Sequence, residues 1–397
     1  MRVVKIRLRL HILHLLLKKG VSFSVIRSSF KKLLAIRKEN MGNIKLIKYT
    51  KLGRQYSWAM YAPPFPSKEL DRLLNKEIDF ALRDGMSANP LHFIFLSITK
   101  KCPLNCEHCF EWDIMHRPEQ LSLDNLKGIV SGFIEQGISS VFLSGGEPLS
   151  RYNDLLKLLE YASPHCKTWL FSSGYTLDES KAYALKQAGL TGAIISIDHF
   201  EEEAHNAFRR NPKSFERAIN AVKNIKVAGL IPALSVCATK EFLSEENLHK
   251  YMEFAKSLGA VFVQFMEPVA EGRYKEQDVA LNENQLALLS NFFRSFNEDE
   301  AKADYPTIIY QGYHQRKVGC HGGGKRFLYV DSDGNIQACP FCPNKMGNAL
   351  QKPLQYNGGS CKQLNRQQFN LSSYETIVAY HPKVHAVLNN GLYGFKL

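Results

Sequence analysis

Residues 92–266 show a regular alternation of short apolar runs with longer amphipathic stretches, and this pattern constrains the fold more than any other feature. Each apolar run has the length of a buried strand. The runs are Phe93–Ile98, Val141–Ser144, Thr168–Phe171, Ala193–Ile197, Ile231–Val236 and Val261–Met266. The stretches between them start at residues that cap helices and stop at glycines, namely Ser122 to Gly137, Asp178 to Gly189, Ser214 to Gly229 and Ser244 to Gly259. Strands joined by helical crossovers predict an α/β protein with a parallel sheet, whose functional loops follow the carboxyl ends of the strands.

The positive charge of the chain is concentrated at its start. The formal net charge is +13 at pH 7, and residues 1–40 contain 11 Lys and Arg but a single acid, Glu39. The remainder is nearly balanced, so we expect no nucleic-acid partner bound over the whole surface. With 45% hydrophobic and 22% charged residues, the composition is that of an ordinary globular protein.

Residues 1–40 predict a basic amphipathic helical extension. Its apolar residues recur at helical spacing between Lys and Arg: Leu10, Leu13, Leu17, Ile26, Phe30, Leu33 and Leu34. Such a segment either packs on the protein's own surface, which we favour, or contacts an anionic membrane or an acidic partner. A translation start at Met41 would remove it. Because Leu8–Leu17 is too short to span a bilayer and no secretory signal is visible, we expect a cytoplasmic protein, with any membrane association made through residues 1–40.

Residues 41–91 form a second segment before the alternating domain, which we place at residues 92–290. This segment predicts two strands, Ile44–Tyr49 and Tyr56–Tyr61, followed by a proline-rich boundary. A helix is expected over Ser67–Arg83.

Residues 291–397 predict a small metal-organised domain. The strand and helix alternation stops after about Leu289, and the last hundred residues hold many glycines and four of the nine cysteines. The odd number of cysteines and their clustering argue against disulfides and for metal ligation in a reducing compartment.

Cys102, Cys106 and Cys109 form a C-x₃-C-x₂-C loop directly after the first predicted strand. Thiolates are soft ligands that suit iron–sulfur clusters or zinc. A structural zinc site needs four ligands, and no fourth is close in the sequence. Three thiolates on a four-iron cube leave one iron open for a bidentate substrate. Zinc, or a remote fourth ligand, remains the alternative.

This loop, together with Ser144-Gly145-Gly146-Glu147-Pro148 after the second strand, resembles the radical S-adenosylmethionine (SAM) superfamily. The resemblance implies that Cys102, Cys106 and Cys109 carry a catalytic [4Fe–4S] cluster that binds SAM. It also implies that Gly145 and Gly146 allow close backbone approach to the methionine amino group, whose charge Glu147 holds. The fold implied is a partial (β/α)6 TIM-like barrel with a C-terminal iron–sulfur domain and an N-terminal helical extension.

Ser196-Ile-Asp198 ends the fourth strand and resembles the S-x-D motif of the same family, with His205 and Arg209 following. By this resemblance Ser196 and Arg209 bind the SAM carboxylate, and Asp198 contacts SAM or substrate. The alternative is a capped strand end and a surface arginine. Ser172 ends the third strand and is a further residue expected to line the cofactor site. Weaker candidates near strand ends are Ser173, Gln264 and Glu267.

The spacing from Cys320 through Gly334 to Cys339 resembles the SPASM/twitch auxiliary-cluster domains. Asp333-Gly334 predicts the turn of a β-hairpin that brings Cys320 and Cys339 to one end. Cys342 and Cys361 complete a set of four thiols. Because the later cysteine-rich run of a full SPASM domain is missing, the resemblance implies a single auxiliary cluster. Cys361 could instead be unligated, and we expect Cys166 and Cys237 to be plain cysteines.

The resemblance implies reductive cleavage of SAM to a 5′-deoxyadenosyl radical, which abstracts hydrogen from a peptide or protein side chain. The alternative is a small-molecule or lipid-linked substrate at the membrane surface, and a minor one is a non-enzymatic iron–sulfur electron carrier. A flavodoxin or ferredoxin would donate the electron. Acid–base candidates are Glu111, Asp113, Glu267, Tyr310 and His321.

Overall fold

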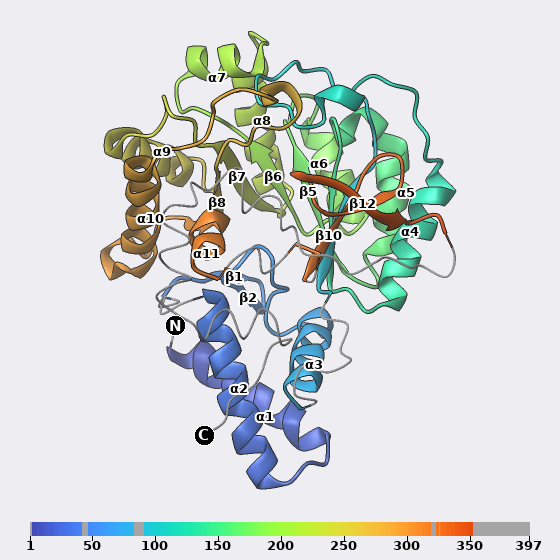
Figure 1. Cartoon of the computed structure of the whole chain (residues 1–397), viewed down its shortest axis with the longest axis vertical. Coiled ribbons are helices and arrows are strands. Elements are labelled where there is room, and N and C mark those ends of the chain that lie inside the picture. The colour runs from blue at the N-terminus through green and yellow to red at the C-terminus, as the bar shows by residue number, and fades with distance from the viewer. Residues whose placement is uncertain (1, 42–46, 83–90, 319–322, 325, 352–397) are drawn as a thin grey trace.

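The computed structural model describes residues 2–41, 47–82, 91–318, 323–324 and 326–351. In this part of the chain one ten-stranded sheet has the order β12-β11-β10-β3-β4-β5-β6-β7-β8-β9 (Figure 1). Its strands are β3 Phe93–Ser97, β4 Ser140–Ser144, β5 Lys167–Ser172, β6 Gly192–Ser196, β7 Ile231–Cys237, β8 Phe262–Met266, β9 Thr307–Tyr310, β10 Phe327–Val330, β11 Asn335–Cys339 and β12 Cys342–Asn348.

The six predicted strands are β3 to β8, and each pairs in parallel with the next. The predicted α/β fold is therefore confirmed. The parallel sheet also extends further than the sequence indicated, because β9 pairs with β8 and β10 pairs with β3. Within the described strands β12 and β9 are the two edges, so the sheet is open and not a closed barrel.

Seven α-helices of the described residues follow strands β3 to β8 of the sheet. They are α4 Leu123–Glu135, α5 Tyr152–Ala162, α6 Glu179–Gln187, α7 Glu202–Arg209, α8 Ser214–Val227, α9 Glu245–Ser257 and α10 Glu283–Glu298. Four of them, α4, α6, α8 and α9, start and stop close to where the sequence predicts. Ser122, Asp178 and Ser244 each accept a hydrogen bond from a backbone N–H of the first turn, at 3.1, 2.8 and 3.1 Å. Ser214 is not a cap as predicted, because it is the first helical residue and donates to Asn206 instead.

The two faces of the sheet differ in composition. The outer face packs aliphatic side chains such as Ile94, Leu96 and Leu143 against the helices. The inner face is aromatic, with Phe93, Phe142, Trp169 and Phe262 buried together. Because parallel strands between helices are buried on both sides, their sequences read as nearly continuous apolar runs.

The N-terminal extension folds as two helices, α1 Arg2–Lys18 and α2 Phe23–Met41, as predicted. They pack beside α3 Lys68–Leu82, and the three helices lie together at one end of the molecule (Figure 1). None of the described helices is both long and apolar enough to cross a membrane.

The segment between α2 and α3 contains a shorter hairpin than expected. Its strands are β1 Thr50–Leu52 and β2 Gln55–Ser57, so pairing falls between the two predicted strands. Residues 44–46 of the first predicted strand lie outside the described part of the chain.

After α10, the chain crosses η4 Glu300–Lys302 to β9 and continues into α11 Gln311–Val318 before the last three strands. Alternation thus continues past Leu289. The division into domains at residues 290 and 291 stays a prediction, and the strands that follow it share the sheet of the preceding region.

Candidate functional site

A cavity of about 1160 Å³ lies on the inner side of the sheet, at the carboxyl ends of the strands, where the sequence places the functional loops. Cys102, Cys106 and Cys109 all line it. It also runs along the aromatic inner face past Phe93, toward the α1 residue Leu8. Five of the seven residues predicted to bind SAM line the same cavity: Gly145, Gly146, Ser172, Ser196 and Arg209.

The cysteine loop is held in place from two sides. On one side the Glu107 N–H donates to the carbonyl of Phe208 at 2.9 Å, and the His108 ring stacks on the Phe208 ring with centroids 4.8 Å apart. On the other side the Arg273 N–H donates to the carbonyl of Cys109 at 3.0 Å. The loop is therefore fixed by α7 and by the short helix η3 Gly272–Tyr274.

The thiols of this loop are suited to metal ligation. Burial raises the pKa of Cys102 and of Cys109 to about 12, so without a cation these thiols keep their protons. Iron displaces those protons on ligation, and three sulfur donors on one short loop are a set that fits an iron–sulfur cluster.

Gly145 and Gly146 pack directly against the backbone that leads into the cysteine loop. A Cβ on Gly145 would lie 2.7 Å from the carbonyl oxygen of Thr99, and one on Gly146 would lie 2.5 Å from that of Lys101. The Gly146 and Glu147 N–H groups donate to the same two carbonyls at 2.8 and 2.7 Å. The close approach that requires glycine is therefore made first to the protein's own backbone.

Substituting Gly146 with alanine is expected to push the two loops apart and to lower both the melting temperature and the iron content. The matched control is Gly128→Ala in α4, where a Cβ would meet nothing within 4 Å and alanine favours the helix. Thermal unfolding and iron analysis of both variants test this. Equal behaviour of the two would contradict the steric argument.

Glu147 is buried and fully engaged in hydrogen bonds. Its Oε1 accepts from the Ser172 hydroxyl at 2.8 Å and from the Leu149 N–H at 3.1 Å. Its Oε2 accepts from the Ser173 N–H at 2.7 Å and from the Ser173 hydroxyl at 2.5 Å. In this structure Glu147 orients two serines of the cavity wall, and its contact with the amino group of SAM stays a prediction.

Arg209 is a buried residue of the cavity and not a surface arginine, so that alternative is wrong. Its Nε and Nη2 donate to Oδ2 of Asp198 at 2.6 and 2.5 Å, and its Nη1 lies 3.5 Å from the Cys106 sulfur. Asp198 also accepts from the Cys237 N–H at 3.0 Å. Although burial opposes ionisation, the positive charge of Arg209 holds the pKa of Asp198 below its usual range. A fixed positive charge therefore stands beside one cluster cysteine.

A second polar group lines the cavity near the end of β8. The Tyr310 hydroxyl donates to Oε1 of Glu267 at 2.5 Å, and Nη1 of Arg316 donates to the same oxygen at 2.6 Å. Farther along, Tyr61 donates to Gln264 at 3.0 Å. Burial, and then the charge of Glu267, raises the pKa of Tyr310 above its usual range. Sequence reasoning missed Tyr61, which lies in the turn after β2 and lines the cavity, and Arg316 of α11, which binds the cavity residue Glu267, because neither segment carries a motif.

The predicted C-terminal hairpin is present, with Asp333 and Gly334 in the turn between the antiparallel strands β10 and β11. Cys339 lines the cavity, and its Cα lies opposite that of Cys342 across β11 and β12. Cys320, Cys361 and the acid–base candidate His321 lie outside the described residues.

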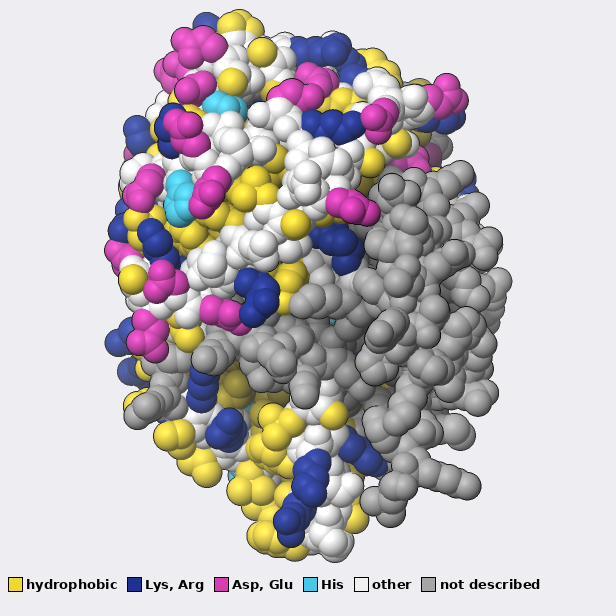
Figure 2. Space-filling view, turned by 60° about the vertical axis from the view of Figure 1, so that its left-hand side comes forward, with side chains coloured by type: hydrophobic (Ala, Val, Ile, Leu, Met, Phe, Trp, Pro, Cys, Tyr) yellow, Lys and Arg dark blue, Asp and Glu magenta, His cyan; other side chains and the backbone are white. Residues whose placement is uncertain are grey.

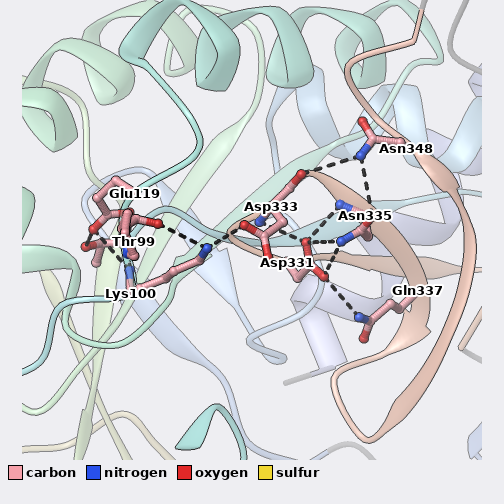
Figure 3. Close-up of polar contacts among 9 residues, drawn as sticks. Thr99, Lys100, Glu119, Asp331, Asp333, Asn335, Gln337 and Asn348 are labelled. Atoms are coloured by element: carbon pink, nitrogen blue, oxygen red, sulfur yellow. Dashed lines mark hydrogen bonds and ion pairs between the residues drawn. The ribbon is translucent and has the colours of Figure 1, made fainter. Parts of the chain in front are cut away.

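The hairpin is tied to the strand that precedes the cysteine loop (Figure 3). The buried Lys100 donates to Oδ1 of Asp333 at 2.5 Å, while Thr99 donates to Glu119 at 2.5 Å. Asp331 organises the turn by accepting from the N–H groups of Asp333 and Asn335 at 2.9 and 2.8 Å. These contacts hold Cys339 and the first cysteine loop around one cavity.

The remaining candidates have plainer environments. Burial, with the charges of Asp331 and Asp333, raises the pKa of Glu111 to about 8, and Asp113 lies in the short helix η1 Trp112–Ile114. Cys166 is buried and donates its thiol to the carbonyl of Ala162 at 3.5 Å. Cys237 is buried at the cavity wall.

Comparison with known proteins gives one family and several relatives. The sequence profile of the radical SAM superfamily matches residues 96–257. The AdoMet-dependent heme synthase of Methanosarcina barkeri is 27% identical over 67% of this chain and 81% of its own length. The mycofactocin maturase MftC of Mycolicibacterium smegmatis is 26% identical over 62% of this chain and 63% of its own.

Solved structures show the same fold at low sequence identity. Streptococcus suis SuiB bound to S-adenosylmethionine matches 90% of this chain and 80% of its own, with a TM-score of 0.57 at 15% identity. The structure of anSMEcpe with bound AdoMet matches 76% of this chain and 100% of its own, with a TM-score of 0.56 at 19% identity.

Proposed function

Since the chain belongs to the radical SAM superfamily and is a radical SAM enzyme that uses a [4Fe–4S] cluster and SAM, we propose that Cys102, Cys106 and Cys109 hold the cluster and that the substrate is a peptide or protein side chain. One observation carries the assignment of the site. The three thiols line a single cavity with Gly145, Gly146, Ser172, Ser196 and Arg209.

When bound, the cluster and SAM would supply a 5′-deoxyadenosyl radical, with the electron coming from a flavodoxin or ferredoxin. The chain contributes position and electrostatics. Arg209, held by Asp198 at 2.5 Å, places its charge beside the sulfur of Cys106. Ser172 and Ser196 provide hydroxyl groups at the strand ends for the amino-acid part of SAM, and the apolar wall beyond them excludes water from a reactive radical.

The size of the cavity supports a second occupant beside SAM. Pockets for a single small ligand measure about 300–1,000 Å³, and this one exceeds that range. SuiB has been solved with its precursor peptide SuiA, and anSMEcpe with a bound Cp18Cys peptide. We therefore place a peptide side chain next to SAM, in the part of the cavity lined by Gln264, Glu267 and Tyr310.

A small-molecule or lipid-linked substrate is the second candidate, and one observation favours it. The far end of the cavity is lined by apolar residues of α1 and α2, among them Leu8, Ile12 and Phe30. An apolar chain threaded along the aromatic inner face would reach these helices.

The function is tested by incubating the anaerobically reconstituted enzyme with SAM and dithionite. Release of 5′-deoxyadenosine is expected, and a fully clustered enzyme that releases none would refute the proposal. Peptides encoded beside the gene are then added one at a time, with isoprenoid-linked or acyl-linked molecules as the second set. The set that accelerates 5′-deoxyadenosine release and changes mass identifies the substrate class.

We further propose one auxiliary iron–sulfur cluster on Cys320, Cys339, Cys342 and Cys361. Reconstituted protein is then expected to hold about eight irons, as two four-iron clusters require. The double variant Cys339→Ser/Cys342→Ser should retain about four irons and keep SAM cleavage without substrate, whereas Cys166→Ser should lose none. About four irons in the unaltered protein would remove the auxiliary cluster.

A further inference from the structure

The helix α1 has two apolar faces, and among the described residues only one of them is packed against other helices. On the inner face Leu15 and Leu16 pack with Ile26 of α2 and Ile78 of α3. Polar contacts fix the same orientation, because His11 lies 2.6 Å from Asp71 and Lys19 donates to Asp79 at 2.8 Å. The helix therefore presents a defined opposite face to the solvent.

That opposite face carries a stripe of exposed apolar side chains. Val3, Ile6, Leu10 and Leu17 follow one another at intervals of three, four and seven residues, which places them on one side of an α-helix. Their exposed fractions are 68%, 55%, 59% and 51%, and Phe23 just beyond the helix is 80% exposed. We call these five residues the apolar stripe.

The apolar stripe stands out from the rest of the described surface. Of the thirteen large hydrophobic residues that the described residues expose, seven lie between Val3 and Leu34, and the others are scattered. Isolated exposed hydrophobics need no explanation, but a contiguous set marks an interaction surface.

The charges around the stripe are all positive. Exposed Arg7, Arg9 and Lys18 flank it on α1, and exposed Arg27 and Lys31 follow on α2. The first acid of the sequence is Glu39. Figure 2 shows this end of the molecule, at the bottom of the view, as yellow and dark blue surface. No magenta appears on the described residues at that end.

We propose that α1 binds an anionic lipid surface, with the apolar stripe inserted at the level of the headgroups and the flanking Lys and Arg paired with lipid phosphates. An exposed apolar stripe marks an interaction surface, and Lys and Arg near it are attracted to anionic lipid headgroups. A second copy of this chain fits worse, since a two-fold interface would place one cationic face against another.

The proposal is tested with the full-length enzyme and sedimentation of vesicles made of phosphatidylcholine alone or with about 30% phosphatidylserine. The enzyme is expected to bind the anionic vesicles and to dissociate at high salt, because salt shortens the range of the charge attraction. The variant Ile6→Gln/Leu10→Gln/Leu17→Gln should bind more weakly by about a thousandfold, since each of the three lost apolar side chains weakens partitioning by about tenfold.

Two control variants separate the contributions. Tyr183→Gln/Val227→Gln removes exposed apolar residues from α6 and α8 and should bind like the unaltered enzyme. Lys18→Gln/Arg27→Gln should weaken binding about fivefold per charge on anionic vesicles only. All three variants should retain 5′-deoxyadenosine release without substrate, which separates failure of membrane binding from failure of the proposed chemistry.

Three outcomes would overturn the proposal. One is equal vesicle binding by the apolar-stripe variant and the unaltered enzyme. Another is a dimer in solution that the stripe variant dissociates, which would assign the face to a second copy. The last is stronger capture of poly-glutamate than of anionic vesicles, which would assign it to an acidic protein.

Discussion

Replacement of Cys106 by alanine is expected to abolish release of 5′-deoxyadenosine. The variant loses one of the three proposed cluster ligands, and it leaves the Arg209 guanidinium without the sulfur that lies 3.5 Å away. The loss should exceed the roughly 10–100-fold cost of removing an outer partner of a metal ligand. Iron content, the visible absorption of the cluster and anaerobic SAM cleavage measure it together.

Cys166→Ala is the matched control for this experiment. Cys166 is also buried, but its thiol contacts only the carbonyl of Ala162 among the partners the structure gives it. Iron content and SAM cleavage should be unchanged in this variant. If Cys106→Ala kept the cluster and its activity, the assignment of the three-cysteine loop would be wrong.

Removal of Arg209 is expected to destabilise the protein by about 3–5 kcal/mol, because Arg209→Leu leaves the buried Asp198 carboxylate unpaired. Asp198 has a pKa below its ordinary value of 3.8 in the folded protein. The stabilisation from its ionised form is therefore present above that value and is lost as the pH falls through the lower, folded-state pKa. Anaerobic urea unfolding at neutral pH measures the loss.

The variant Arg209→Leu also tests whether Arg209 positions a charge beside Cys106 or only stabilises the fold. Arg54→Leu, on the exposed turn of the β1–β2 hairpin, is the control and should change stability by less than about 0.5 kcal/mol. The double variant Asp198→Asn/Arg209→Leu removes both charges and should recover part of the stability that Arg209→Leu loses. It should not restore the cluster's reduction potential, because the positive charge beside Cys106 is still missing. A double variant as unstable as Arg209→Leu would contradict the argument from an unpaired charge.

The six strands, the capped helices and the cysteine loop could be predicted because each depends on neighbours in sequence. Alternating hydrophobic runs, a serine or aspartate cap and a terminal glycine are local signals. The extra parallel strands β9 and β10 could not be found this way. β10 pairs with β3 across more than two hundred residues, and its short run of Phe327–Val330 carries no sign of that partner.

The residues of the candidate site also divide into those that local sequence signals predicted and those that they did not. Residues that follow a strand end, such as Ser172, Ser196 and Arg209, were found at the cavity, since parallel strands bring their carboxyl ends to one edge. Tyr61 and Arg316 were not predicted, because no local pattern distinguishes them from ordinary surface residues.

By itself the sequence determined the periodicity, the cysteine spacing and the basic N-terminal segment, all of which are written in the order of residues. Only the tertiary structure decided that Glu147 binds Ser172 and Ser173, that Arg209 stands beside Cys106, and that one face of α1 is left uncovered. Buried charges and hydroxyls find partners by distance in space, and distant segments meet only when the whole sheet has packed.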